Sequence, residues 1–160
     1  MAGLEDLYRE IILDHYRAPR NRGELAVPPA HRVEGFNPLC GDEVVLYLDV
    51  EDGLVSDVKI AGQGCSISQA STSMMSAAVK GKSVDEARTI TRAFKALMSI
   101  HESKIGGDGE EVDVADELDG VRLGDLEALQ GVVKFPVRIK CATLAWNTLT
   151  QGLDEIETPQ

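Results

Sequence analysis

Two strand-like segments joined by a tight turn limit the folds open to this chain. Residues 43–51 (EVVLYLDVE) are rich in Val, Leu and Tyr, and residues 54–61 return with a less regular alternation of apolar and polar side chains. The Asp-Gly pair at 52–53 is a strong signal for a two-residue hairpin turn. The two segments are therefore predicted to pair as antiparallel strands, with a third short strand at 31–36.

Helical patterns occupy most of the remaining sequence. The segment 66–79 is rich in Ser, Ala and Met, and Ser83 with Glu86 three residues later forms a capping box. Because the strands precede most of the helices, a parallel β-α-β sheet is not expected. We predict a single α+β domain over residues 1–160, a small antiparallel sheet of about three strands with helices packed on one face. The helices are expected at 4–17, 66–79, 84–103 and 123–130, and from 138 or 140 to 156.

The net charge of −11 is concentrated in one stretch of the chain. Nine acidic residues against a single base lie between residues 105 and 130, which we interpret as a solvated acidic insertion. An acidic chain repels phosphate backbones, so no nucleic-acid partner is expected. No apolar run approaches the roughly 18 residues that span a bilayer, and the N-terminal residues lack the order typical of a signal peptide. We therefore expect a cytoplasmic protein with no membrane partner.

Three cysteines are an odd number, and in a chain expected in the cytoplasm they argue against a disulfide framework. Each falls at a predicted break between elements: Cys40 in a loop, Cys65 after a glycine-rich turn, and Cys141 near the start of the last helix. Unpaired N–H groups at helix starts favour a thiolate, the form that binds metal or attacks sulfur. Arg138 and Lys140 would add positive charge beside Cys141, although both also fit a solvated helix start.

Asp42, two residues after Cys40, is a candidate fourth ligand. Three thiolates and one carboxylate suit zinc or an iron–sulfur unit better than magnesium or calcium. The carboxylate is the harder and more exchangeable ligand, which points to a site that opens. Spacing alone leaves both a shared site and separate buried cysteines open, because Cys141 follows Cys65 by 76 residues and no C-x-x-C pair is present.

Several motifs, in a fixed order along the chain, resemble those of a known protein family. The chain resembles the U-type iron–sulfur cluster assembly proteins, the superfamily of IscU and the NifU N-terminal domain, almost from end to end. The motifs that carry this resemblance are LDHYRAPRN at 13–21, NPLCGD at 37–42, GCSIS at 64–68, VKGKSVDEA at 79–87 and RIKCATLAW at 138–146.

Within that family the sequence departs from the scaffold branch, IscU, in three ways. Lys140 stands where the scaffold branch carries a histidine ligand, and KFPVR at 134–138 replaces its chaperone-docking motif LPPVK. The acidic insertion is also absent from that branch. These departures argue against docking to the dedicated Hsp70-type chaperone and against histidine-assisted cluster binding. All three are similar to the SufU branch.

The resemblance implies a zinc-dependent sulfur acceptor with four metal ligands, Cys40, Asp42, Cys65 and Cys141. Cys40 would take persulfide sulfur from a SufS-type cysteine desulfurase once a ligand from that partner replaces it on the metal, and Arg138 would stabilise the developing thiolate. Iron–sulfur assembly proteins would take the sulfur onward. The chain would then be a sulfurtransferase-type acceptor that activates an enzyme. Two alternatives stay open: a scaffold that assembles a transient [2Fe–2S] cluster on the same ligands, and a zinc-stabilised interaction domain without sulfur chemistry.

Overall fold

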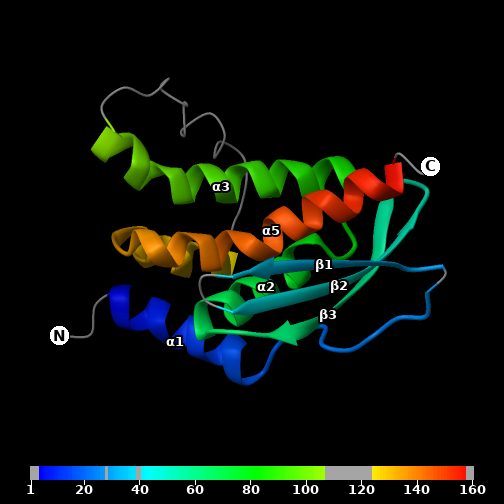
Figure 1. The fold of residues 1–160 in the computed structure, drawn as a ribbon, viewed down its shortest axis with the longest axis horizontal. Coiled ribbons are helices and arrows are strands. Elements are labelled where there is room, and N and C mark those ends of the chain that lie inside the picture. Colours follow the sequence, from blue (N-terminus) through cyan, green and yellow to red (C-terminus); the bar gives the residue numbers. More distant parts are fainter. Residues whose placement is uncertain (1–3, 28, 39–40, 107–123, 158–160) are drawn as a thin grey trace.

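A computed structural model describes residues 4–27, 29–38, 41–106 and 124–157 of the chain. Cys40 and residues 107–123 of the expected acidic insertion lie outside these ranges. Figure 1 shows the described elements in chain order. They are α1 (Leu4–Arg17), β1 (His31–Asn37), β2 (Asp42–Glu51), β3 (Leu54–Gln63), α2 (Ser66–Val79), α3 (Val84–Gly106), the 3₁₀ helix η1 (Gly124–Lys134) and α5 (Pro136–Glu157).

The predicted hairpin is formed by β2 and β3. It belongs to a three-stranded antiparallel sheet with the order β1-β2-β3, in which β2 is the central strand. At the turn, Asp52 and Gly53 both have positive φ angles, 52° and 76°, as a type I′ hairpin requires. At the opposite end of the same strand pair, Glu43 of β2 pairs with Gln63 of β3. This pairing places the start of β2, which is Asp42, beside the end of β3, which Cys65 follows.

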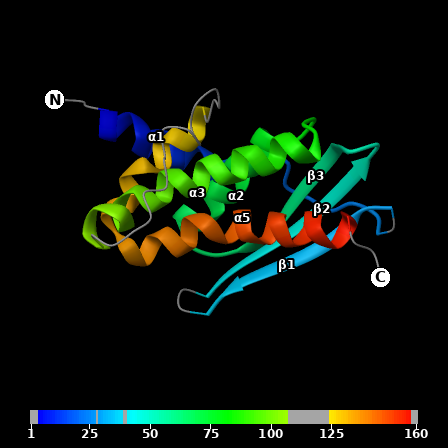
Figure 2. The same ribbon diagram turned by 90° about the horizontal axis from the view of Figure 1, so that it is seen from above.

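The helices lie on one face of the sheet, so the predicted α+β fold is confirmed (Figure 2). On α5, Gly152 lies so close to β2 that a Cβ there would meet Leu48 Cδ1 at 2.8 Å. On β1, a Cβ on Gly35 would collide with the side chain of Thr148. Because both positions lack a side chain, α5 lies almost directly against the sheet.

The core joins α5 to α2 and α3 through a buried tryptophan. The ring of Trp146 stacks on Phe94 with 4.8 Å between centroids and 18° between planes. Its indole N–H donates to Ser71 Oγ at 3.2 Å, and the Ser71 hydroxyl donates to the carbonyl oxygen of Ala142 at 2.6 Å. Replacing such a residue by alanine costs about 3–5 kcal/mol in typical cores. The first half of α5 is therefore firmly held against α2, and Cys141 with it.

Several element boundaries differ from the sequence expectations. The helix α3 continues to Gly106, and η1 buries Leu126 and Leu129 in the core. The C-terminal end of the expected acidic insertion thus belongs to the packed core. The helix α5 begins at Pro136 rather than at 138 or 140, since proline is favoured in the first turn of a helix. Among the described helices, none is long and apolar enough to cross a membrane.

Candidate metal centre

Three of the four expected ligands converge at one end of the molecule. Asp42 begins β2, Cys65 precedes α2, and Cys141 lies on α5. One ligand atom from each of these residues lies within 4.8 Å of the other two. Cys40, the fourth expected ligand, lies outside the described residues, one position before Gly41 and two before Asp42. The fold therefore joins residues that are up to 99 positions apart in the sequence.

Cys65 is the N-cap of α2, as the sequence predicted. Its backbone is extended, with φ −68° and ψ 165°, and its Sγ accepts a hydrogen bond from the Ser68 N–H at 3.4 Å. The first turn of α2 contains no acidic residue. The sulfur of Cys65 therefore lies beside an N–H donor at the positive end of the helix dipole.

Asp42 is fully buried, and the turn before α2 orients its carboxylate. The backbone N–H of Cys65 donates to Asp42 Oδ1 at 2.9 Å, while Oδ2 lies 3.8 Å from Cys65 Sγ. A Cβ on Gly64 would come within 2.5 Å of Oδ1, so only glycine leaves room for this arrangement. One carboxylate oxygen is thus held by the backbone, and the other faces the sulfur.

Cys141 lies further from the start of its helix than the sequence suggested. The expectation that it lies at a helix start is wrong, because α5 begins five residues earlier, at Pro136. The unpaired N–H groups of a helix are confined to its first turn, so they do not account for thiolate character at Cys141. The side chain is fully buried, and neither Cys65 nor Cys141 is part of a disulfide.

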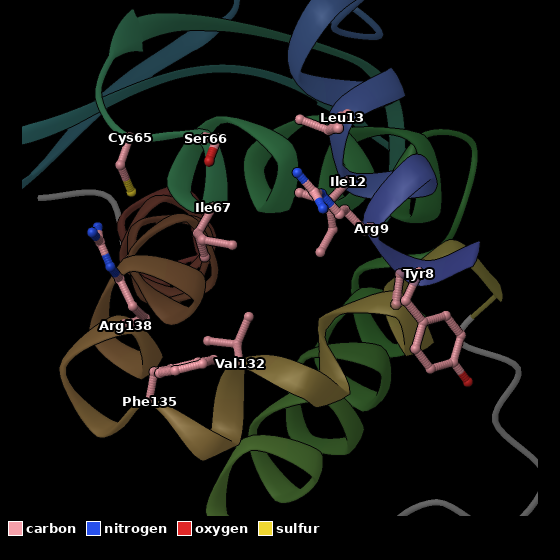
Figure 3. A pocket seen from close by; sticks show the side chains of 11 residues that line it. Tyr8, Arg9, Ile12, Leu13, Cys65, Ser66, Ile67, Val132, Phe135 and Arg138 are labelled. Carbon is pink, nitrogen blue, oxygen red and sulfur yellow. The ribbon is translucent and has the colours of Figure 1, made fainter. Parts of the chain in front are cut away.

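Arg138 supplies a positive charge near this cluster. It lies in the first turn of α5, where its backbone N–H donates to the carbonyl oxygen of Phe135 at 2.7 Å. Figure 3 shows its guanidinium and the sulfur of Cys65 pointing toward each other. A cation in this position favours ionisation of a nearby thiol. Lys140, also noted in the sequence, is exposed on the same helix.

A pocket opens beside the cluster, and the sequence did not indicate it. Its volume is about 810 Å³, and Cys65 and Arg138 are among the residues that line it (Figure 3). The remaining wall is largely apolar and comes from α1, the start of α2, η1 and the start of α5. No motif links these segments, because they meet only through tertiary packing.

The donor set fits a soft divalent ion. Tetrahedral zinc with bonds of 2.0–2.3 Å places its ligand atoms about 3.3–3.8 Å apart, which is a small contraction from the observed group. Burying a carboxylate such as Asp42 is costly unless the charge is compensated, and a bound cation would compensate it. Thiolate sulfur selects zinc or iron–sulfur units over magnesium and calcium. Asp42, Cys65 and Cys141 can therefore hold such an ion, with room in the set for one further ligand.

Fold and site together define a small α+β domain with a mixed thiolate and carboxylate metal centre. The chain belongs to the family described as NifU-like N terminal domain, whose model matches residues 7–142. It is similar to the zinc-dependent sulfurtransferase SufU of Bacillus subtilis, with 44% identity over 98% of this chain and 95% of that protein. It is also similar to the iron–sulfur cluster assembly scaffold protein IscU of Thermotoga maritima, with 36% identity over 96% of each chain.

A solved structure supports the same fold. The crystal structure of a SUF-system iron–sulfur cluster assembly scaffold protein from Fervidobacterium islandicum superimposes with a TM-score of 0.73. The two sequences are 32% identical, and the match covers 94% of this chain and 99% of that one. The family expected from the sequence motifs is therefore confirmed.

Proposed function

We propose that this protein is a zinc-dependent sulfur acceptor in iron–sulfur cluster assembly, which receives persulfide sulfur from a SufS-type cysteine desulfurase on Cys40. The observation that carries the proposal is the convergence of Asp42, Cys65 and Cys141 within 4.8 Å. Similarity to the B. subtilis zinc-dependent sulfurtransferase over nearly the whole chain supports the choice of metal and of chemistry. In this proposal Cys40 completes the ligand set.

The chemistry assigned to Cys40 is a sulfur transfer without net oxidation. Bound zinc would keep the coordinating sulfurs ionised and restrained. The Cys40 thiolate attacks the terminal sulfur of the persulfide on the desulfurase, and a new sulfur–sulfur bond forms on Cys40. The bond between that sulfur and the cysteine of the desulfurase breaks, and its electron pair stays on the departing thiolate. Arg138 stabilises negative charge on the thiolates at this end of the domain.

Two of the proposed ligands are anchored by the fold. Cys65 is fixed by the cap of α2, and Cys141 by the packing of α5 on α2. Cys40 is joined to the rigid strand β2 through Gly41, which has a positive φ angle of 71°. Glycine adopts this conformation without strain. We therefore assign the acceptor role to Cys40 rather than to either anchored cysteine.

A second candidate function is a scaffold that assembles a transient [2Fe–2S] cluster on the same four ligands. The similarity to the IscU scaffold protein of T. maritima over 96% of both chains favours it. Purified protein separates the two functions. A colourless sample with about one zinc per chain supports the acceptor, and a brown sample that donates its cluster supports the scaffold.

The proposal also covers partners and cellular location. Proteins of this family work in iron–sulfur assembly with cysteine desulfurases, and we assign the desulfurase here to the SufS type. Iron–sulfur assembly proteins would receive the sulfur from Cys40. Cys65 and Cys141 are outside any disulfide, which suits the reducing cytoplasm, and we place the protein there.

Mass spectrometry after incubation with a SufS-type desulfurase and cysteine tests the transfer. We expect the mass of one added sulfur atom on Cys40 in the wild-type protein and none in Cys40→Ala. The same mixture without cysteine is the control, because the desulfurase then has no sulfur to deliver. Normal sulfur uptake by Cys40→Ala would contradict the assignment of the acceptor.

A further inference from the structure

The pocket beside Cys65 is an open groove formed by four separate elements. In Figure 3, Ile12 of α1, Ile67 of α2 and Val132 of η1 point into the same space. Ile12 and Ile67 are only partly buried, although both pack against the hydrophobic core. The groove thus exposes apolar side chains that the fold has not covered.

Exposed apolar side chains also lie next to groove residues along the sequence. Phe135 lines the groove and is 63% exposed, and Val137, two residues later, is 68% exposed. On the facing helix, Leu7 is 55% exposed and precedes the groove residue Tyr8. Large exposed apolar patches rimmed by polar residues are typical of protein interfaces. A small molecule enclosed in the groove would leave these outer side chains uncovered, so the surface fits a macromolecular partner better.

Both charged residues of the groove are arginines. Arg9 lies on α1 and Arg138 on α5, so they face the groove from two of its walls. Both are exposed, and they stand out in a chain with a net charge of −11. A segment that fills the groove would therefore meet apolar walls and two guanidinium groups. Carboxylates are the natural counterparts of such groups.

From these features we infer that the groove is a docking site for a segment of the sulfur-donating desulfurase that combines an aromatic or aliphatic anchor with carboxylates. Cys65 lines the groove and belongs to the metal group, so a protein that reaches the metal group also covers the mouth of the groove. The anchor packs among Ile12, Ile67 and Phe135, and the carboxylates pair with Arg9 and Arg138. This inference rests on the proposed function, because that function supplies the partner.

Calorimetric titration of the zinc-loaded full-length protein with a SufS-type desulfurase, at low and high salt, tests the inference. We expect Phe135→Ser to weaken binding about tenfold, as removal of an aromatic anchor does. Arg9→Glu should weaken it by a similar factor of about ten at low salt and flatten the salt dependence. Both residues are exposed, so neither change should disturb the fold, which circular dichroism and zinc content will verify.

Two matched variants serve as controls. Leu54→Ser changes an exposed apolar residue of the β2–β3 hairpin, and Arg17→Glu reverses an exposed charge on α1; neither residue lines the groove. Both should bind the desulfurase with wild-type affinity. Equal affinity of all four variants would overturn the inference. It would also be overturned if the wild-type protein dimerised and Phe135→Ser made it monomeric, because a second copy would then occupy the groove.

A separate readout distinguishes this inference from the proposed function. Sulfur uptake by the wild-type protein is measured in the same mixtures by mass spectrometry. If the wild-type protein takes up sulfur but the groove variants bind normally, the docking inference fails and the proposed function stands. If binding depends on the groove but no sulfur is transferred, the proposed function fails, and with it the assigned role of the docked segment.

Discussion

The two ends of the domain are stabilised in different ways. We call the end that carries Asp42, Cys65 and Cys141 the metal end, and the end with the Asp52-Gly53 turn and the last turns of α5 the hairpin end (Figure 1). At the hairpin end the protein supplies its own counter-charges. Arg88 of α3 pairs with two acids of α5, at 2.9 Å to Asp154 and 3.0 Å to Glu157, and His31 of β1 lies 2.7 Å from Glu155.

The metal end instead gathers metal-ligating side chains, whose charge a bound cation would compensate, and apolar side chains that the fold leaves exposed. Its ligands are a buried carboxylate, a buried cysteine and the half-buried Cys65, and exposed apolar residues such as Phe135 and Val137 lie on the same segment of the chain as Cys141. Surface ion pairs contribute little to stability, whereas a bound metal contributes its full binding free energy to folding. The hairpin end thus pairs its charges within the folded chain, whereas the metal end presents a donor set that can hold a cation.

The largest expected effect comes from removing a buried ligand at the metal end. Cys141→Ser should weaken zinc binding by more than about a hundredfold, since even changes behind the ligands cost 10–100-fold. Competition with a chromophoric chelator gives the affinity, and elemental analysis gives the stoichiometry. Arg88→Ala at the hairpin end is the matched control and should bind zinc normally. Unchanged zinc affinity in Cys141→Ser would remove the distinction between the two ends.

A smaller loss is expected when the ligands stay and only their support changes. In Gly64→Ala the new Cβ would come within 2.5 Å of Asp42 Oδ1 and displace the carboxylate. We expect zinc affinity to fall about tenfold, the lower range for changes behind a metal ligand. Gln63→Ala, one residue earlier and exposed, serves as the control. If Gly64→Ala bound zinc as tightly as the wild-type protein, the backbone would not be what orients Asp42.

The smallest effect is expected at the hairpin end and depends on pH. Hydrogen bonds from His31 and then from Gln151 lower the pKa of Glu155 below its ordinary value. A lowered carboxyl pKa adds stability that is present above the unfolded-state pKa and lost as the pH falls through the folded-state pKa. Glu155→Gln should therefore lower the Tm slightly near neutral pH and have no effect in acid.

Thermal unfolding across the acid range measures this difference. Glu24→Gln, which removes an exposed acid elsewhere, is the control for a general change in charge. A Tm difference that persisted unchanged into acid would contradict the role given to the His31–Glu155 pair. Zinc affinity should be unaffected throughout, which again separates the hairpin end from the metal end.

Local patterns predicted the elements well, and contacts between distant segments account for what they missed. The Asp52-Gly53 turn and the small-residue helix α2 are encoded in short stretches, and α2 begins and ends where the sequence indicated. The position of Cys141 beside Cys65 instead depends on packing between α2 and α5, through Ser71 and Trp146. Sequence spacing does not reveal such packing. The residues alone therefore did not decide between a shared site and separate buried cysteines, and only the family motifs indicated the shared site.

The same limit applies to the support of the site and to the groove. Glycine at position 64 suggested only a break before Cys65, whereas its role is to leave room for the carboxylate of Asp42. The groove combines α1 with η1 and the start of α5, and each of these carries an ordinary apolar stripe on its own. Only their relative placement shows which apolar side chains remain uncovered.

The pairing of Glu43 with Gln63 links metal capture to correct assembly of the sheet. Asp42 begins β2 just before this pair, and Cys65 follows the end of β3 by two residues, so their separation depends on the alignment of β2 with β3. A slip of one residue in a strand turns every side chain to the opposite face, and it would carry Asp42 away from the two sulfurs. An incorrectly aligned chain would thus lack one ligand for the ion. Tight metal binding therefore selects the chains in which the β2–β3 hairpin has paired correctly.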